Sequence, residues 1–500
     1  MITQKCDLAI IGGGPAGMAG AIVARRYEMD VCLLDEQPRF GGQIYRQPPR
    51  DFRVPSWLSG AGYAKGKALL ARAEQLTGLR HLAPATVWAC FKSGSEATAD
   101  VAHDVLFHND ETAGRVNARH VLIACGCYEA PMPFPGWHLP GVMSAGGIQT
   151  LLKSQRIAAG HSVVLAGSHP LLFVVAEQLL SAGVKIAAIC MVQSLHAAWG
   201  LVRSARTTIT GSKQIFSTLK TLIALHQARV PVLYGHVVDE ARGSRELGAV
   251  RIRDVARGTH RVIDCDALGV CYGFYPSSEL ARQAGAKHFW AAEGGWVIKA
   301  DEYMRSSVPG ISVAGELTGV AGAEAAALSG EIAALGVARD LGRVSMEQAD
   351  GQLRKLQKRL TGLRAFASLL ARLATPSGEL PEQLAHRSTL ICRCEDVTLG
   401  EIEDAVSSDP GIQSASTAKL LTRAGMGLCQ GRMCETSVRR IVARQRGIDL
   451  QQVAGYVVRP PVKPVPVALL SAYPSALTLD PHSLADPSQN SRISAPRTTR

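Results

Sequence analysis

The chain has few aromatic residues and no long apolar run. Only 5% of its 500 residues are Phe, Trp or Tyr, and no basic run is interleaved with them, so the net charge of +12 does not indicate nucleic-acid binding. No apolar stretch is long enough to cross a bilayer, and the first residues lack the layout of a signal peptide. We therefore expect a cytoplasmic protein, at most peripheral to the inner membrane, whose basic surface leaves an acidic protein or an anionic membrane surface open as a partner.

Cysteine is plentiful, but its distribution is uneven. In a cytoplasmic protein, 12 cysteines do not indicate a disulfide framework. Eight are scattered through apolar segments, where we expect small buried side chains. These eight are Cys6, Cys32, Cys90, Cys125, Cys127, Cys190, Cys265 and Cys271. Only the last four cysteines of the chain have the spacing of metal ligands.

A glycine-rich loop lies near the start of the chain. Apolar runs at residues 7–11 and 31–35 predict two strands, and residues 15–27 between them predict a helix. The loop that joins the first strand to the helix reads G-x-G-x-x-G. Its residues are Gly12, Gly14, Pro15, Ala16 and Gly17. This order is the first half of a Rossmann-type unit.

Each glycine of this loop has a role in binding a dinucleotide. Gly12 allows the tight turn, Gly14 lets the backbone approach a pyrophosphate, and Gly17 lets the helix pack close to the strand. The free N–H groups of the helix N-terminus then face the phosphates. Asp35, at the end of the second strand, is placed to accept hydrogen bonds from a ribose.

Three later segments favour FAD over NAD. The sequences FGGQ (40–43), VLIACG (121–126) and PGISVAGELTGVAG (309–322) resemble, in the same order, flavin-contacting segments of disulfide-reductase-like flavoproteins. Glu316 stands where many of those proteins carry Asp, and either acid can accept a hydrogen bond from a hydroxyl. The FAD contacts expected from these segments are Gly42, Gln43, Ala124, Gly126, Gly315 and Glu316.

A second strand–loop–helix–strand unit begins near residue 162. Its loop carries His169 and Leu172 where a second G-x-G-x-x-G would carry glycines, and no acid ends the following strand. A side chain at the second glycine position would obstruct a pyrophosphate. The loop favours a retained fold with a lost or altered nucleotide site over a nicotinamide site, so NAD(P) is not an expected cofactor.

The last four cysteines are spaced C-x-C, 34 residues, then C-x4-C. They are Cys392, Cys394, Cys429 and Cys434. Four thiolates are the usual ligands of a [2Fe–2S] cluster, two for each iron. Zinc is the rival, although zinc sites more often use C-x2-C pairs. A redox-active flavin in the same chain favours the cluster, because zinc cannot pass electrons. Arg423 and Arg432 flank these cysteines and would favour cluster reduction.

These features predict an α/β protein with two Rossmann-like domains of the disulfide-reductase type, one inserted in the other, and a small C-terminal α-rich [2Fe–2S] domain. The expected divisions are as follows: an FAD-binding domain at 1–155 and 265–345, a second Rossmann-like domain at 156–264, a helical linker at 346–388, the cysteine domain at 389–450, and a Pro-rich arm with a disordered tail at 451–500.

Taken together, the motifs resemble those of the A (alpha) subunits of opine oxidase and the related subunits of hydrogen cyanide synthase and of hydroxyproline and proline dehydrogenase complexes. The resemblance rests on IIGGGPAGMAGA, FGGQIYR, PFPGWHLPGVMSAGGIQTLL, ISVAGELTGVAGAEAA, and CRCEDVT followed by TRAGMGLCQGRMC. The cysteine motif is similar to the small module of bacterioferritin-associated ferredoxin type. His169 departs from the family, where glycine is usual.

The resemblance implies an oxidoreductase subunit that acts on CH–NH donors. It implies FAD and a [2Fe–2S] cluster as cofactors, a separate FAD-dependent beta subunit that oxidises the C–N bond, and room for a small gamma subunit. The present chain would relay electrons to a quinone or another respiratory acceptor. It needs no acid–base pair of its own, and the sequence shows no catalytic triad spacing.

Two other functions stay open at this point. A stand-alone NAD(P)H-dependent reductase would need a working second nucleotide loop, and chemistry like that of thioredoxin reductase would need a C-x-x-C pair. Cys125 and Cys127 are spaced C-x-C instead. A non-catalytic iron–sulfur partner protein would leave the FAD loop without a use. The sequence does not name the substrate, the stoichiometry or the electron acceptor.

Overall fold

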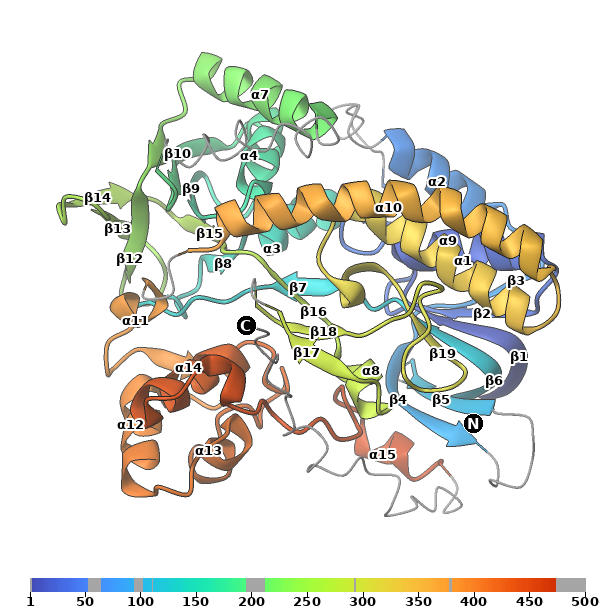
Figure 1. The fold of residues 1–500 in the computed structure, drawn as a ribbon. Helices are drawn as coiled ribbons and strands as arrows, with labels where there is room; N and C mark the ends of the chain where they lie inside the picture. Colours follow the sequence, from blue (N-terminus) through green and yellow to red (C-terminus); the bar gives the residue numbers. More distant parts are fainter. Residues whose placement is uncertain are drawn as a thin grey trace, which may run out of the picture.

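The computed structural model describes residues 2–52, 64–93, 102–109, 111–194, 212–291, 294–376 and 380–473 (Figure 1). Within these ranges, no helix is both long enough and apolar enough to cross a membrane. The architecture is α/β, with two sheet domains and a small helical domain near the C-terminus, as the sequence predicted.

The first domain is built on a seven-stranded sheet. Its strands run in the order β3 (Leu79–Leu82), β2 (Val31–Leu34), β1 (Ile2–Ile11), β6 (Ala113–Ile123), β5 (Ala102–His108) and β4 (Thr86–Ser93), and β19 (Ile311–Val313) pairs with β6. Strands β1, β2, β3, β6 and β19 are parallel, and β4 and β5 are antiparallel. Because parallel strands end at one edge, the loops after β1, β2, β6 and β19 meet there.

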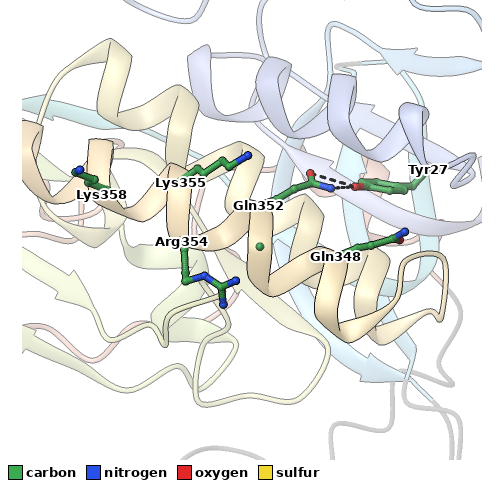
Figure 2. Close-up of a pocket in the computed structure, with 7 residues that line it drawn as sticks. Tyr27, Gln348, Gln352, Arg354, Lys355 and Lys358 are labelled. Atoms are coloured by element: carbon green, nitrogen blue, oxygen red, sulfur yellow. Dashed lines mark hydrogen bonds between the residues drawn. The ribbon is translucent and has the colours of Figure 1, made fainter.

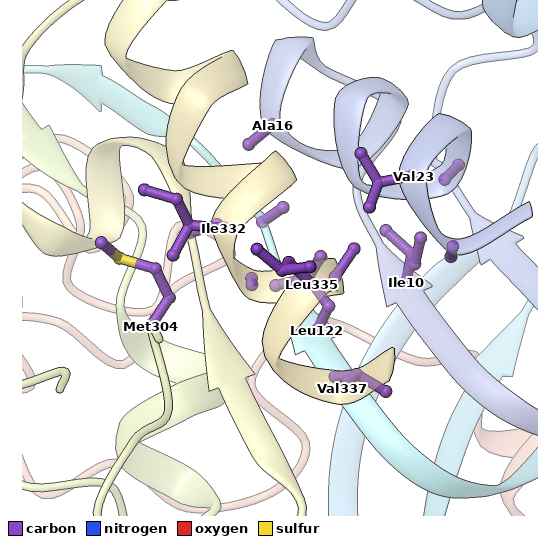
Figure 3. Close-up of a cluster of buried hydrophobic side chains, with 14 of the residues drawn as sticks. Ile10, Ala16, Val23, Leu122, Met304, Ile332, Leu335 and Val337 are labelled. Atoms are coloured by element: carbon purple, nitrogen blue, oxygen red, sulfur yellow. The ribbon is translucent and has the colours of Figure 1, made fainter. Parts of the chain in front are cut away.

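Helix α1 (Pro15–Arg26) packs against α9 (Ala323–Asp340) to cover one face of this sheet. Figure 3 shows Ile10, Val23 and Leu335 pointing into the same cluster of buried side chains. The two helices approach closely at Gly330, where a Cβ would lie 2.0 Å from the carbonyl oxygen of Ala16. The small residues of α1 and α9 therefore bring the glycine-rich loop next to the segment that precedes α9.

Two predicted boundaries in this domain were wrong. The first strand begins at Ile2 rather than at residue 7, because its polar N-terminal half pairs with β6. The sequence from Glu316 to Leu341 predicts a helix, but helix α9 begins only at Ala323. Residues Gly315–Thr318 form a 3-10 turn instead, and Gly319 follows with a φ of +116° that no helix can contain.

The second domain contains a five-stranded sheet in the order β11 (Val232–Tyr234), β10 (Lys185–Met191), β9 (Ser162–Gly167), β15 (Ala267–Cys271) and β8 (Val142–Ser144). All of its pairs are parallel. Strands β8 and β15 lie outside 156–264, so this sheet extends beyond the bounds expected for the inserted domain. They join it because β15 pairs with β9 on one side and with β8 on the other.

Within the described residues, three helices and a meander complete this domain. The helices are α3 (Ala145–Thr150), α4 (Leu171–Ser181) and α7 (Ser212–Gln227), and the meander is β12 (His236–Arg242), β13 (Ala249–Asp254) and β14 (His260–Asp264). A one-turn π-helix, Leu151–Gln155, follows α3 directly. The sequence around residues 197–228 predicts basic helices, of which only α7 falls in the described part of the chain.

Short paired strands lie between the two sheets. They are β7 (Cys127–Glu129) with β16 (Phe274–Pro276), and β17 (His288–Trp290) with β18 (Trp296–Ile298). Two further helices, α2 (Ala64–Glu74) and α8 (Glu279–Gln283), belong to the first domain. Helix α10 (Met346–Ala374) then runs from the first domain toward the second, as Figure 1 shows.

The C-terminal part begins with α11 (Leu380–Leu384), whose two end leucines pack in the core of the second domain. The cysteine domain follows with β20 (Leu390–Cys392), β21 (Val397–Thr398), α12 (Leu399–Ser408), α13 (Ala415–Thr422), α14 (Glu435–Arg446) and the 3-10 turn Leu450–Gln452. It has its own buried core, which includes Ile402, Val438 and Val442.

The Pro-rich arm returns to the first domain. The backbone N–H of Val462 donates to the carbonyl of Trp88 at 2.9 Å, and Tyr473 packs edge-on against Trp88. A short helix, α15 (Val467–Leu470), lies in this arm below β4 and β5 (Figure 1). The disordered tail expected at the end of the chain falls at residues 474–500, outside the described residues.

Candidate FAD site and cysteine centre

The glycine-rich loop connects β1 to α1 as predicted. Gly12 has a φ of +107°, and a Cβ there would lie 2.4 Å from the carbonyl oxygen of Ala124. A Cβ at Gly17 would lie 1.8 Å from the carbonyl oxygen of Gly12. At Gly14, in contrast, the nearest atom to a Cβ would be the Cα of Gly42 at 3.8 Å. The space above Gly14 is therefore open, at the N-terminus of a helix that has Pro15 in its first turn.

Asp35 lies beside this loop and is hydrogen-bonded to it. Its carboxylate accepts hydrogen bonds from the backbone N–H of Gly13 and, at 2.6 Å, from that of Gln37. Burial raises the pKa of this carboxyl, although the two N–H groups oppose the shift. Each carboxylate oxygen has a second lone pair, so Asp35 can hold the loop and still accept from a ribose hydroxyl.

The other expected contacts come from three loops at the same edge of the sheet. Gly42 lies against Gly14, and the N–H of Gly41 donates to the carbonyl of Gly13 at 2.9 Å. Ala124 is buried against Gly12, whereas a Cβ at Gly126 would meet nothing within 4 Å. Gln43 is exposed. These loops leave open backbone at Gly14 and Gly126, which fits an extended dinucleotide such as FAD.

Glu316 has a different set of partners from those expected. Its carboxylate accepts from the backbone N–H of Ala321 at 2.7 Å and of Gly322 at 3.1 Å, just before α9. Burial raises its pKa, and these two N–H groups and the nearby Arg364 oppose the shift. Arg364 donates to the hydroxyl of Thr318 at 2.7 Å. The extra methylene of Glu, compared with Asp, lets the carboxylate fold back onto α9.

Two cations near these loops, half-buried Arg364 and buried Lys153, were missed by the sequence reasoning. Arg364 comes from α10, which looked like a linker. Lys153, in the π-helix, is only 3% exposed, and its Nζ donates to the carbonyl of Ile44 at 2.9 Å. Burial lowers the pKa of Lys153 to about 7. A lysine within LLKSQ carries no sequence signal for such a contact, although a π-helix often marks a functional place in a fold.

The loop after β9, which lacks two of the three glycines of the motif, is occupied by the side chain of its own His169. Nδ1 of His169 accepts from the N–H of Leu171 at 3.1 Å, and the ring packs edge-on against Phe274 with centroids 4.9 Å apart. Burial lowers the pKa of His169 to about 4. A neutral imidazole thus stands where a nucleotide-binding loop would present backbone.

Cys125 and Cys127 were expected to be buried, but both are half-buried. The reason is their position at the open edge of the sheet and at the start of β7. Burial of the sulfur atom raises the pKa of the Cys125 thiol to about 12, so it is not poised as a thiolate. The other six scattered cysteines are buried as expected.

A surface hollow of about 750 Å³ lies away from this site, between the end of α1 and the outer face of α10. Figure 2 shows the hydrogen-bonded pair Tyr27 and Gln352 beside it, with Arg354, Lys355 and Lys358 along the helix. None of the predicted site residues lines it.

The four C-terminal cysteines meet as two pairs. The thiols of Cys392 and Cys434 share a hydrogen bond, and so do those of Cys394 and Cys429. The N–H of Gly425 donates to the sulfur of Cys392 at 3.4 Å, and the hydroxyl of Tyr456 lies 3.5 Å from the sulfur of Cys434. The hydrogen bond with Cys434 lowers the pKa of the Cys392 thiol to about 6.

This pairing bears on the kind of metal centre. Among the described residues, no three Cys, His, Asp or Glu side chains are arranged to hold one metal ion. Two thiol pairs side by side fit the two thiolates per iron of a [2Fe–2S] cluster, and four thiolates are also a ligand set for zinc.

The cysteine domain is joined to the first domain at α14, which begins directly after Cys434. The indole N–H of Trp296 donates to Glu435 at 2.8 Å. The guanidinium of Arg439 is fully buried, 3.9 Å from the ring centroid of Trp290 and 4.6 Å from that of Trp296. Arg432 adds an ion pair of 3.4 Å with Glu279 of α8.

Comparison with known proteins agrees with this fold. Residues 6–340 match the family described as pyridine nucleotide-disulphide oxidoreductase, and residues 386–473 match the sarcosine oxidase A3 domain. The chain is 34% identical to the A-subunit of opine oxidase from Rhizobium meliloti, over 94% of this chain and 88% of that protein. It is also 34% identical to the HcnB subunit of hydrogen cyanide synthase from Pseudomonas protegens, over 93% and 97% respectively.

Among solved structures, L-proline dehydrogenase from P. horikoshii has the same fold, with a TM-score of 0.69 and 21% identity over 94% of this chain and 80% of that one. The chain therefore belongs to the pyridine nucleotide-disulphide oxidoreductase family, in the group that holds the opine oxidase A-subunits and the HcnB subunits of hydrogen cyanide synthase, and is a flavin-dependent oxidoreductase.

Proposed function

We propose that this chain is the electron-transferring alpha subunit of a heteromeric flavoprotein that oxidises the C–N bond of an amino acid, an imino acid or an opine. Its relatives over nearly the whole chain are named as subunits of opine oxidase and hydrogen cyanide synthase. The proposed partner is an FAD-dependent beta subunit that oxidises the substrate, and a small gamma subunit would be a further component. The final acceptor would be a quinone or another respiratory carrier.

Two cofactor sites belong to this proposal. FAD would be held by the loops at Gly12–Gly17, Gly42–Gln43, Ala124–Gly126 and Gly315–Glu316, with Asp35 at the ribose. A [2Fe–2S] cluster would be held by the two thiol pairs of the cysteine domain. When bound, FAD accepts two electrons and the cluster passes them one at a time. The chain itself positions the two groups and excludes water between them.

One observation carries the proposal: strand β18 touches both candidate sites. It packs against Gly315–Thr318, the segment that follows β19 at the FAD edge. From the same strand, Trp296 reaches Glu435, which directly follows Cys434. A non-catalytic scaffold would not need this connection, whereas a chain that passes electrons needs its two centres held at a fixed short separation.

The contacts made by the loop region of the second domain also favour a relay over a stand-alone NAD(P)H reductase. The Nε2 of Gln193, in the second domain, donates to the carbonyls of Ser168 at 2.7 Å and of Ala374, the last residue of α10, at 3.1 Å. With His169 packed in the loop, this edge is occupied by protein groups where a nicotinamide dinucleotide would lie.

The test is an anaerobic absorption titration of the purified chain with NADH and NADPH. We expect the flavin band to stay oxidised, and to bleach when a co-expressed beta subunit is present and an amino-acid, proline or opine substrate is added. Rapid bleaching by either nicotinamide alone would overturn the proposal in favour of a reductase. Absence of bound flavin would favour a non-catalytic partner protein.

A further inference from the structure

The two thiol pairs of the cysteine domain differ in exposure. Cys392 and Cys434 are 1% and 0% exposed and lie toward α14 and Tyr456. Cys394 is exposed and Cys429 is half-buried. The centre therefore has an inner edge that is packed in the core of the cysteine domain and an outer edge that faces solvent.

Three large apolar side chains stand exposed beside the outer edge. Leu420, Leu421 and Leu428 are 72%, 59% and 79% exposed, and all lie in the segment that leads into Cys429. This segment is in contact with the other outer thiol, because a Cβ at Gly427 would lie only 2.2 Å from the Cβ of Cys394. Leucines exposed to this extent, next to a candidate redox centre, indicate a surface that another protein covers.

The charged groups around these leucines are mostly basic. Arg423 is two-thirds exposed and pairs with Glu395 at 2.9 Å. Exposed Arg393 lies over the ring of Trp137 at 5.0 Å, and Lys419 lies over the ring of Tyr456 at 5.3 Å.

Two carboxylates lie next to the outer thiols in the chain: Glu395, which is paired with Arg423, and exposed Asp396. Three cations against two carboxylates, in a chain of net charge +12, favour an acidic partner over a basic one.

We propose that the outer edge, defined as Leu420, Leu421, Leu428, Arg423 and the Cys394–Cys429 pair, is the docking surface for an acidic one-electron carrier protein. This proposal rests on the proposed function, because the cysteines must hold a redox cluster. One electron leaves this chain through the outer thiols and reduces the redox centre of the carrier by one electron. No bond forms or breaks, and no proton is needed. Leucines at the centre of the face supply apolar burial, and the cations steer the carrier to it.

The probe is the acidic copper protein plastocyanin, and the basic haem protein cytochrome c is the charge-reversed control. The purified chain with its cofactors is reduced anaerobically and mixed with each oxidised carrier in a stopped-flow instrument. Isothermal titration calorimetry with oxidised plastocyanin gives the affinity independently of electron transfer. We expect plastocyanin to react faster than cytochrome c at low salt, and its advantage to shrink as ionic strength rises.

The variants are Leu421→Asp and Arg423→Gln, with Leu428→Asp as a third closer to the cysteines. The matched controls are Phe216→Asp, which changes a 72% exposed apolar side chain on α7, and Arg354→Gln on α10. Each outer-edge variant with full iron content should weaken plastocyanin binding and slow its reduction by about tenfold, while the controls match the original chain. Leu421→Asp keeps the test valid if Leu428→Asp loses iron.

Wild-type rates and affinities in iron-replete Leu421→Asp and Arg423→Gln would overturn the docking surface and leave the relay function standing. A faster reaction with cytochrome c would overturn the acidic partner. If the unsubstituted chain contained no iron, the proposed function itself would be refuted. The two failures are therefore distinguishable.

Discussion

The indole N–H of Trp296 donates a 2.8 Å hydrogen bond to the carboxylate of Glu435, across the junction between the first domain and the cysteine domain. The same carboxylate oxygen accepts from the N–H of Tyr456 at 3.1 Å. Arg439, one turn further along α14, donates to the carbonyls of Val453 and Leu450, both at 2.9 Å, while its guanidinium stacks on the indoles. The junction is thus a buried polar and aromatic contact with a defined geometry.

Trp296→Phe should loosen this junction. The variant keeps an aromatic ring but removes the N–H that donates to Glu435, and a hydrogen bond to a charged group contributes about 1.5–3 kcal/mol, toward the lower end for a half-buried pair such as this one. We expect slower arrival of electrons at the iron centre after substrate reduction, measured by freeze-quench EPR. The matched control is Trp88→Phe, which removes an indole hydrogen bond of 3.2 Å to Tyr473 far from the cysteines. Equal rates in both variants would show that the contact does not position the centres.

Gly14→Val and Gly12→Ala should fail in different ways. A Cβ at Gly14 would make only a van der Waals contact of 3.8 Å with the Cα of Gly42, so Gly14→Val should fold but lose most of its flavin. Gly12→Ala puts a Cβ 2.4 Å from a backbone oxygen at positive φ and should lower the melting temperature as well. The absorbance ratio of flavin to protein and thermal melts by circular dichroism separate the two effects.

The control for the glycine-loop pair is Gly351→Ala on α10, where a Cβ would lie 4.0 Å from its nearest neighbour. It should keep full flavin content and match or exceed the original melting temperature. Full flavin content in Gly14→Val would place the pyrophosphate elsewhere.

Lys153 should make the fold more stable as pH rises. Its pKa of about 7 in the folded chain is below its ordinary value of 10.5, so the unfolded chain binds more protons between these two values. The free energy of unfolding therefore increases with pH across that window, by up to about 1.4 kcal/mol per pH unit from this group. In Lys153→Met this increase should be lost.

Urea unfolding at pH 7, 8 and 9 measures the slope. Lys185→Met, at the exposed start of β10, is the control and should keep the original pH dependence. An unchanged slope in Lys153→Met would mean that the lysine stays protonated in the folded chain.

Cys434→Ser should remove iron from the protein, whereas Cys190→Ser should not. Both sulfur atoms are fully buried, so the loss of packing is similar at the two sites. Only Cys434 belongs to a thiol pair, and a serine hydroxyl is a poor ligand for iron in a sulfur cluster. Iron and acid-labile sulfide analysis, with EPR of the reduced protein, checks the difference. Zinc in place of iron in the original chain would contradict the cluster assignment.

Some features of the candidate site could be read from short stretches of sequence. The loop at Gly12–Gly17 depends on residues that are adjacent in the chain, and its steric requirement at Gly12 is local, so the strand–turn–helix order was predictable. The start of α9 at Ala323 was not predictable in this way. The helical pattern of the sequence continues through Gly319 and Gly322, but the positive φ angles of these two glycines keep them out of the helix. The cysteine spacing likewise indicated candidate ligands but did not indicate how the four thiols would pair.

The sequence by itself determined the α/β class, the family, and the residue types of both candidate centres, because these depend on local patterning and on the chemistry of individual side chains. Only the tertiary structure decided that Trp296 reaches Glu435, that Glu316 turns to α9, and that Lys153 is buried against the loop at Ile44. Each of these contacts joins residues from separate elements. Their pairing depends on how the sheets, helices and cysteine domain pack together, which no local stretch of the chain specifies.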